Sequence, residues 1–487
     1  MRDREGFLDK RTPDTDLPMA QKFRNVIKPA HVPQPVVAKS QAKFQQAYTL
    51  YQIGQLAPAQ TLLEAVLKKD PKHHDALQLL SFIAFQTKEF QIALRLLDRS
   101  LRICPDADVY SNRGIVLYEL RQLEAAVASY DQAIALRPGN AEAYSNRGNA
   151  LKDLGQLDAA VASYDQAIAL RPDIGEVRYN KSLALLLGGD LVAGWELHEW
   201  RWATEKMKPM KRSFPQPLWL GKDSLAGKTI LLHSEQGFGD TIQFCRYAKL
   251  VSDLDARVIL EVPKSLLGLL KQLSGVSDFV VDGTPLPAFD YHCPLLSLPL
   301  VFKTTVGSIP CPTPYLRAEP GKLTYWRNKL GEKRAPRVGL VWSGRTEHTN
   351  DHNRSIGLAA LLQQLPSGYE YVSLQKDVRD RDKPVLESTP HIRHFGGGLD
   401  DFTDTAALCE LMDVTISVDT SVAHLSGALG KPTWVLLPFS PDWRWLLNRE
   451  DSPWYPSVRL YRQPRVGDWD SVLRKVNAQL TEQNQNW

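Results

Sequence analysis

Residues 125–138 read AAVASYDQAIALRP, and residues 159–172 read the same letters 34 positions later. The tetrapeptide SNRG recurs with the same shift, at 111–114 and 145–148. Prolines close successive units at spacings of 34, 33 and 34 residues: Pro71, Pro105, Pro138 and Pro172. A fixed period in this range predicts a repeat array in which each unit stacks on its neighbours.

Each repeat divides into two short helical patterns. In the unit 140–173, residues three and four positions apart form one face of each helix: Ala143, Tyr144, Gly148 and Leu151, then Ala159, Ala160, Tyr164, Ala167 and Ile168. Gly148 and Ala159 are small, so the two helices are expected to approach closely. Gly155 lies in the predicted turn, and Pro172 ends the second helix because it cannot continue the hydrogen-bond ladder.

The unit resembles the tetratricopeptide repeat, most strongly in the two copies that share these letters. Weaker units precede them at about 38–72 and 73–105, and a degenerate fifth covers about 174–202. An all-α solenoid of about five hairpins is therefore expected over 38–205, behind a flexible segment at 1–37. The resemblance implies that the array binds a protein or peptide and has no catalytic role.

The fifth unit carries tryptophans where the repeat has small residues: Trp195, Trp200 and Trp202. Two interpretations remain open. These side chains either cap the array and dock it on the next domain, or they are ordinary core aromatics.

The composition is typical of a globular protein, with 43% hydrophobic and 23% charged residues among 487. A net charge of +4 without a basic block argues against nucleic acid. The cysteines are scattered and form no CxxC pair, which argues against a zinc site or a disulfide framework: Cys104, Cys245, Cys293, Cys311 and Cys409. No apolar run is long enough to span a bilayer. We expect a cytoplasmic protein without a metal or a cofactor.

From residue 225 onward, short apolar runs alternate with helical patterns. The predicted strands of a first lobe are 229–233, 257–262 and 278–281, and those of a second lobe are 337–342, 369–374, 414–418 and 433–437. A βαβ series implies a parallel sheet covered on both faces. We expect two Rossmann-like doubly wound lobes, at 206–325 and 326–487, joined through a proline-rich linker at 310–336.

Polar and glycine-rich segments follow these strands, at the sheet edge where open α/β sheets bind ligands. After the first strand come Gly237, Gly239, Asp240 and Thr241. The glycines allow the backbone to approach a ligand, and the next helix starts here with free N–H groups that suit anions. Asp240 is either a catalytic carboxylate or only the cap of this helix.

The second lobe offers a similar arrangement. Candidate ligand-binding residues follow three of its strands: Ser343, Arg354, Gln375, Lys376, Asp419, Thr420, Ser421 and His424. The last four lie at a predicted helix start, where N–H groups and hydroxyls suit a diphosphate and His424 suits a phosphate or ribose oxygen. Trp443, Trp445 and Trp454 either line the site or pack in the core.

Residues 237–241 and 419–424, with the Gly-Lys-Pro that ends at Pro432, resemble motifs of the lipopolysaccharide heptosyltransferases, glycosyltransferase family 9. The resemblance covers about 225–480. It implies a GT-B fold of two facing lobes, a metal-independent inverting transfer, Asp240 as general base, and Asp419 to His424 on the donor diphosphate. Ser421 stands where that family has glycine. His233 and Glu235 in the longer first loop remain alternative bases.

Protein O-GlcNAc transferases also join such repeats to a GT-B unit, which is an analogy of architecture. The sequence therefore predicts transfer of a sugar from a nucleotide-diphosphate sugar to a protein or peptide acceptor. Two alternatives are a sugar-nucleotide epimerase on the same fold and a catalytically inert scaffold.

Overall fold

The computed structural model describes residues 35–311, 313–348 and 350–484. Contacts divide them into two units. Unit 1 comprises 35–180 with 203–206, and unit 2 comprises 181–202 with 207–484. Most of the predicted flexible segment, residues 1–34, lies outside the described residues, and its last residues, 35–37, are helical. The boundary between the units lies inside the degenerate fifth repeat.

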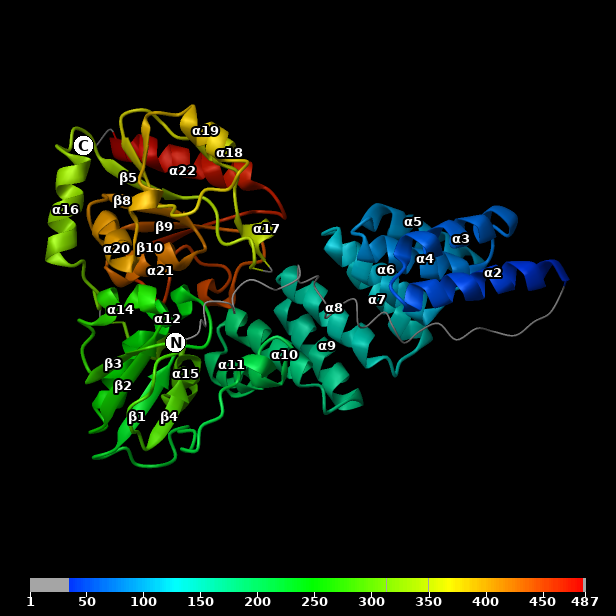
Figure 1. Ribbon diagram of the computed structural model, residues 1–487, viewed down its shortest axis with the longest axis horizontal. Helices are drawn as coiled ribbons and strands as arrows, with labels where there is room; N and C mark the ends of the chain where they lie inside the picture. Colours follow the sequence, from blue (N-terminus) through cyan, green and yellow to red (C-terminus); the bar gives the residue numbers. More distant parts are fainter. Residues whose placement is uncertain (1–34, 312, 349, 485–487) are drawn as a thin grey trace, which may run out of the picture. The chain divides into compact units, whose positions relative to one another are not determined.

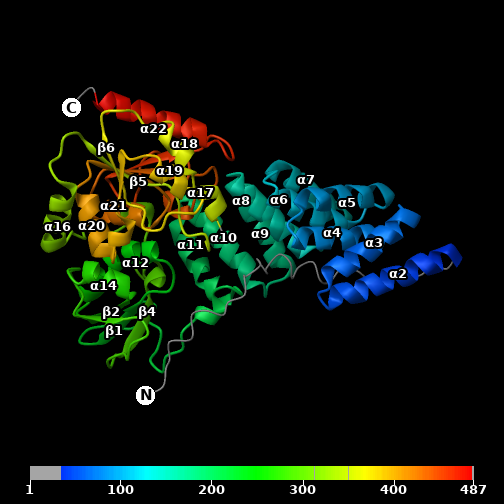
Figure 2. The same ribbon diagram turned by 45° about the horizontal axis from the view of Figure 1, so that its top comes forward.

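Unit 1 is a stack of antiparallel helical hairpins (Figure 2). Its helices are α2 (Pro35–Gln52), α3 (Leu56–Lys69), α4 (His74–Gln86), α5 (Phe90–Ile103), α6 (Ala107–Glu119), α7 (Leu123–Leu136), α8 (Ala141–Asp153) and α9 (Leu157–Leu170). Asp106 and Asn140 cap α6 and α8 by accepting hydrogen bonds from free N–H groups of the first turn. The hairpins follow the 34-residue period of the sequence.

Glycine sets the distance between the helices of a hairpin. A Cβ added at Gly148 would lie 2.6 Å from the buried ring of Tyr164, and one at Gly114 would lie 2.5 Å from Tyr130. The predicted close approach is thus made by glycine against tyrosine. Gly155 turns the chain with φ +73°, a backbone conformation that side chains rarely adopt.

Ion pairs between neighbouring helices repeat with nearly the same period. The Nε atom of Arg113 lies 2.7 Å from Oδ1 of Asp98, and that of Arg147 lies 2.6 Å from Oδ1 of Asp131. The four side chains are 28–48% exposed, so solvent screening makes each pair weak. The buried alanine and tyrosine faces therefore stabilise the stack, and the ion pairs set the contacts at its surface.

The fifth hairpin consists of α10 (Gly175–Gly188) and α11 (Leu191–His198), followed by the 3-10 turn η2 (Glu199–Ala203). Residues 181–202 belong to unit 2. Buried Trp195 donates from Nε1 to the carbonyl oxygen of Thr304 at 3.2 Å and packs edge-on against Trp443. Trp195 is thus packed inside unit 2, whereas Trp200 is 40% exposed.

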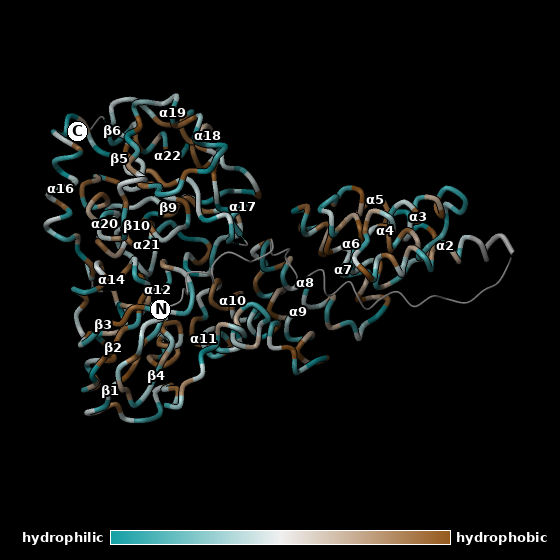
Figure 3. The backbone as a smooth tube through the Cα atoms, viewed as in Figure 1, coloured by the Kyte–Doolittle hydropathy of each residue, from teal (hydrophilic) through white to brown (hydrophobic). Residues whose placement is uncertain are grey.

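Unit 2 contains two separate parallel sheets with helices on their faces (Figure 1). The strands of the first are β1 (Thr229–His233), β2 (Arg257–Val262), β3 (Asp278–Val281) and β4 (Tyr291–Pro294), in the order β3-β2-β1-β4. Its helices are α12 (Phe238–Phe244), α13 (Ala248–Ser252), α14 (Lys264–Leu270) and α15 (Leu298–Val301). Hydrophobic residues of these strands colour the sheet brown in Figure 3.

The strands of the second sheet are β5 (Arg337–Val341), β6 (Glu370–Ser373), β7 (Ile392–His394), β8 (Val414–Val418), β9 (Thr433–Leu437) and β10 (Val458–Arg462). Their order is β10-β9-β8-β5-β6-β7. This is the strand order of an open, doubly wound α/β sheet, with its switch point between β5 and β8. Strands β4, β7 and β10 escaped the sequence analysis because they are short or rich in polar residues.

The helices of the second part are α16 (Pro320–Leu330), α17 (Asp351–Arg354), α18 (Leu358–Leu362), α19 (Lys383–Glu387), α20 (Phe402–Glu410), α21 (Ser421–Ala428) and α22 (Trp469–Asn484). Helix α16 corrects the prediction of a linker over 310–336. Pro320 occupies its first turn, where a missing N–H does no harm. Trp326 is buried and donates from Nε1 to Asp404 at 2.9 Å. The proline spacing concealed a packed helix.

Candidate active site

The starts of α12 and α21 lie against each other within unit 2. A Cβ added at Gly239 would lie 2.8 Å from Cδ2 of His424 and 3.5 Å from the Cα atom of Ser421. Each helix follows a strand next to the switch point of its sheet, where such sheets bind ligands. The structure thus brings together two predicted segments that are far apart in the sequence.

Asp240 caps its own helix and forms an ion pair. Its Oδ2 accepts from the N–H of Gly237 at 2.8 Å, and its Oδ1 accepts from Nη2 of Arg444 at 2.5 Å. Burial raises the pKa of Asp240, and Arg444 opposes this rise. The capping role is therefore present, and the carboxylate also belongs to a charged cluster.

Arg444 is the centre of that cluster, and the sequence analysis missed it. It lies in the 3-10 turn η8 (Trp443–Trp445) after β9 and is 7% exposed. Nη1 donates to Asp442 at 2.9 Å, and Nε donates to Oε1 of Gln243 at 2.8 Å. We call Asp240, Gln243, Asp442 and Arg444 the Arg444 cluster. No local motif marks Arg444, because its partners Asp240 and Gln243 lie more than 200 positions away.

His424 lies one turn into α21 and is buried. Its Nδ1 is hydrogen-bonded to the hydroxyl of Tyr455 at 3.0 Å, and its ring stacks on Trp445 with centroids 5.3 Å apart. Burial lowers its pKa to about 3, and the positive charge of Arg444 adds to this effect. The imidazole is therefore neutral at pH 7.

Asp419 lies where β8 ends, next to the same groups. Its Oδ1 lies 3.9 Å from Nε2 of His424, and its main-chain oxygen accepts from Nη1 of Arg354 at 2.7 Å. Burial and the negative charge of Asp442 raise the pKa of Asp419 to about 6. Arg354 thus ties the loop after β5 to the end of β8 across the switch point.

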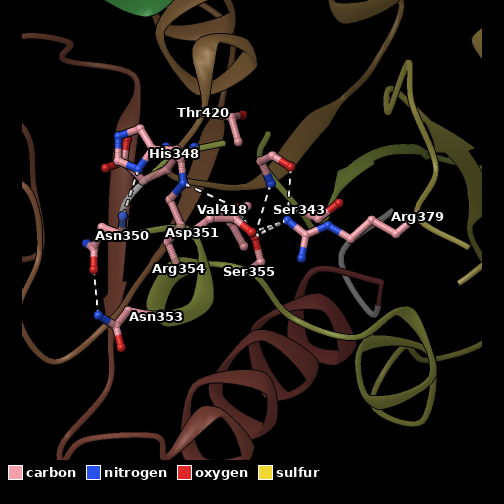
Figure 4. Close-up of polar contacts among 12 residues, drawn as sticks. Ser343, His348, Asn350, Asp351, Asn353, Arg354, Ser355, Arg379, Val418 and Thr420 are labelled. Carbon is pink, nitrogen blue, oxygen red and sulfur yellow. Dashed lines mark hydrogen bonds and ion pairs between the residues drawn. The ribbon is translucent and has the colours of Figure 1, made fainter. Parts of the chain in front are cut away.

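That loop is held by the contacts drawn in Figure 4. Nη2 of Arg379 donates to Asp351 at 2.5 Å, to Ser355 at 2.9 Å and to the main-chain oxygen of Gly344 at 3.0 Å. Ser355 in turn donates to Asp351 at 2.7 Å and accepts from the N–H of Gly344. This framework fixes Arg354, whose guanidinium packs directly over Gly344.

The remaining predicted residues of the second lobe separate into two places. Ser343 and Gln375 are buried against each other, with Nε2 of Gln375 donating to the main-chain oxygen of Ser343 at 2.9 Å. Lys376 is exposed and donates to the main-chain oxygen of Asp400 at 3.2 Å. The described contacts join Lys376 to none of the residues at the starts of α12 and α21.

Thr420 and Ser421 form the start of α21. Across the described residues, no side chain caps this end, and the hydroxyl of Thr420 lies 3.1 Å from that of Ser417. The first N–H groups of a helix lack partners within the helix and suit an anion. On the facing helix, buried Thr241 donates to the main-chain oxygen of Gly237 at 3.3 Å.

Buried polar atoms of this region without a hydrogen-bond partner among the described groups include Nε2 of Gln243 and Oγ of Ser343, and Nε of Arg354 has only Oδ1 of Asp351 at 3.8 Å. An unpaired buried polar group destabilises a protein, so such groups call for an explanation. Hydrogen-bond donors suit a ligand rich in oxygen atoms, because oxygen atoms accept hydrogen bonds.

The two alternative bases, Glu235 and His233, are more deeply buried than Asp240. Glu235 pairs with Arg201 at 3.1 Å, and these side chains are 2% and 0% exposed. Burial raises the pKa of Glu235 to about 7, and Arg201 counteracts this. His233 is buried beside His292, with Nε2 and Nδ1 3.3 Å apart, and burial lowers its pKa to about 3.

The three tryptophans near the end of the chain pack against other side chains. Trp443, Trp445 and Trp454 are all buried. In the part of the chain that the structure describes, no three His, Cys, Asp or Glu side chains are arranged to hold a metal ion. The described helices include none that is long and apolar enough to span a membrane.

Family models for the tetratricopeptide repeat match residues 44–108, 116–155 and 141–174. Unit 1 consists of tetratricopeptide repeats. The models cover both copies with the shared letters and the two weaker units before them.

A relative is Protein FlbA of Caulobacter vibrioides, 26% identical over 467 residues, which cover 90% of this chain and 72% of FlbA. The alignment extends through both units. Solved structures that resemble the chain include MamA (TM-score 0.33, 20% identity, 36% of this chain and 98% of that one). Another is YrrB, described as a TPR protein with an unusual peptide-binding site (TM-score 0.32, 17% identity, 36% and 93%).

Proposed function

We propose that unit 2 is a GT-B glycosyltransferase that moves a sugar from a nucleotide-diphosphate sugar to an acceptor hydroxyl. One observation carries the proposal: two α/β lobes bring the starts of α12 and α21 together, so that Gly239, the chain neighbour of Asp240, lies against His424. Ligands of such sheets bind at this edge. The nearness of the two helix starts supports the roles that the resemblance to family 9 implies for the two motifs.

The reaction is a single displacement. The acceptor oxygen attacks the anomeric carbon, the bond from that carbon to the phosphate oxygen breaks, and the nucleoside diphosphate leaves with the electron pair. Asp240 takes the acceptor proton as general base. Its side chain is 19% exposed, compared with 2% for Glu235, which favours Asp240 over this alternative. Buried His233 is similarly inaccessible.

The leaving group needs stabilisation without a metal. We assign this to the N–H groups and hydroxyls of Thr420 and Ser421 at the start of α21 and to neutral His424. Arg354, fixed by the framework behind it, adds positive charge. Ser343 and Gln375 support the loop after β5, and Lys376 has no part in this arrangement.

The tetratricopeptide repeats of unit 1 are proposed to bind a protein or peptide that carries the acceptor hydroxyl. Stacked repeats form extended surfaces that other proteins of this type use for binding. An epimerase needs no such partner, so the repeats favour a transferase. An inert scaffold remains the alternative, since binding alone needs no base.

The test combines a binding screen with a matched pair of variants. Nucleotide sugars are screened for thermal stabilisation by tryptophan fluorescence, and the donor that raises the midpoint is incubated with wild type, Asp240→Asn and Asp253→Asn. Asp253 is an exposed first-lobe carboxylate paired with Lys249 and serves as the control.

We expect sugar release or transfer to fall at least a hundredfold in Asp240→Asn and to stay at the wild-type level in Asp253→Asn. Equal rates of sugar release or transfer in all three proteins would show that Asp240 is not the general base. Binding without turnover by the wild type would favour the scaffold, and an altered free donor sugar would favour the epimerase.

A further inference from the structure

Arg444 holds the base in its resting position. Its guanidinium uses one N–H for Asp240, one for Asp442 and one for Gln243. A guanidinium carries five N–H groups, so two are not accounted for by these bonds. As a planar donor with spare N–H groups, it is suited to bind phosphate oxygens in pairs.

The place of Arg444 in the fold links both sides of the site. Its chain neighbour Trp443 packs edge-on against Trp195, and its other neighbour Trp445 stacks on His424. Its side chain crosses from the second lobe to α12 of the first lobe. Arg444 is therefore anchored beside the start of α21 while it binds the carboxylate at the start of α12.

The charges of this region do not suit a diphosphate as they stand. The carboxylates Asp240, Asp419 and Asp442 are balanced by the cations Arg246, Arg354 and Arg444, and a diphosphate adds at least two negative charges. A base must also be free to accept a proton, whereas the Oδ1 atom of Asp240 is engaged by Arg444. If the guanidinium changes partner, the carboxylate is free to accept a proton and the positive charge of Arg444 faces the added phosphate instead.

We propose that Arg444 is a diphosphate-binding residue that exchanges the Asp240 carboxylate for phosphate oxygens when the donor binds. This inference rests on the proposed function and assigns to it a residue outside both recognised motifs. The carboxylate of Asp240 is then released only while a donor is bound, so proton abstraction is limited to the complete complex.

The exchange predicts that substitutions at Arg444 and at Asp240 have opposite effects on the binding of a nucleoside diphosphate. Dissociation constants are measured by calorimetry for UDP, GDP, ADP, CDP and dTDP, and the tightest of these is used with each variant. Arg444→Gln loses the phosphate contact and is expected to bind at least tenfold more weakly, with Arg444→Lys between it and the wild type. Asp240→Asn no longer competes for the guanidinium and is expected to bind at least threefold more tightly.

Arg449→Gln is the control, because Arg449 pairs with exposed Asp451 in the same lobe and is expected to leave the constant unchanged. Circular dichroism confirms that each variant is folded, and Arg444→Lys serves in place of Arg444→Gln if the latter unfolds. Equal weakening by Asp240→Asn and Arg444→Gln would overturn the exchange but not the donor site. Failure of all five nucleotides to bind the wild type would overturn the proposed function and this inference with it.

Discussion

Unit 1 and unit 2 bring their polar side chains together over very different distances along the chain. In unit 1, Arg147 donates to Ser163, 16 positions away, and Arg113 makes the equivalent bond to Ser129. In unit 2, Arg444 reaches Asp240 across 204 positions. Local contacts repeat and leave a visible period in the sequence, whereas contacts between distant segments leave none.

The unfolding of the two units can be followed by different spectroscopic signals. All 12 tryptophans lie at position 195 or beyond, and those up to Trp469 fall in the described part of unit 2. Tryptophan fluorescence therefore reports on unit 2. Far-UV circular dichroism is dominated by helix, which makes up most of unit 1.

The largest expected effect concerns the buried ion pair of unit 2. Arg201→Ala leaves Glu235 buried without its cation and is expected to lower the free energy of unfolding by about 3–5 kcal/mol at pH 8. Urea unfolding followed by tryptophan fluorescence measures this loss. The control is Arg459→Ala, which removes an exposed pair with Glu450 and is expected to change stability by about 0–1 kcal/mol. Similar losses in both variants would contradict the buried pairing.

A smaller effect is the pH dependence that Glu235 contributes. Its pKa is raised to about 7 in the folded protein, so raising the pH ionises it there while the unfolded chain is already ionised. Its contribution to stability is complete below about pH 4.5 and is lost as pH rises through 7. Relative to wild type, Glu235→Gln should gain about 2–3 kcal/mol between pH 5 and pH 8.

The comparison between variant and wild type matters here, because the lowered pKa values of His233 and His424 act in the opposite direction. Their effects cancel in the difference. A difference that stays constant from pH 5 to pH 8 in urea unfolding experiments would show that Glu235 has an ordinary pKa.

Equivalent substitutions in unit 1 should have equal effects. Gly114→Ala and Gly148→Ala each place a methyl group against a buried tyrosine ring and are expected to destabilise unit 1 by about 1–3 kcal/mol. Circular dichroism should record the loss while the fluorescence midpoint stays unchanged. Gly139→Ala, with open space around the added Cβ, is the neutral control. Unequal losses would show that the packing of glycine against tyrosine differs between the two hairpins.

The smallest effect is expected for a surface pair between helices. Arg137 lies 2.6 Å from Asp108 and its side chain is 51% exposed. Arg137→Ala should lower the stability of unit 1 by about 0.2–1 kcal/mol, and less in 1 M salt. A salt-independent loss in circular dichroism would indicate that the packing of the arginine stem, not its charge, is responsible.

Much of the fold followed from the sequence, because its strongest signals are local. Strands β1, β2, β3, β8 and β9 have the predicted bounds, since each is a short, mostly apolar run; all but β3 are largely buried. Helix α16 was missed because it lies in the proline-rich segment 310–336, which resembles a linker. Strand β10 was missed because Arg459 and Arg462 interrupt its apolar pattern.

The candidate site was predictable only in its two motifs. Asp240 and His424 each lie at a helix start that the sequence marks with small and polar residues. Arg444 carries no such mark, because its burial depends on Asp240 and Gln243 from the other lobe. The buried state of Glu235 likewise depends on Arg201, which sequence reasoning assigned to the repeats.

Because Trp195 and Arg201 are buried within unit 2, they decide where a fragment that contains this unit has to begin. A fragment beginning at 206, after the last predicted repeat, would lack Trp195 and Arg201, the partners of Trp443 and Glu235. It would therefore expose an apolar surface beside Arg444. A fragment beginning at 181 keeps both. Cutting the chain inside α10 is thus the better way to obtain unit 2 alone.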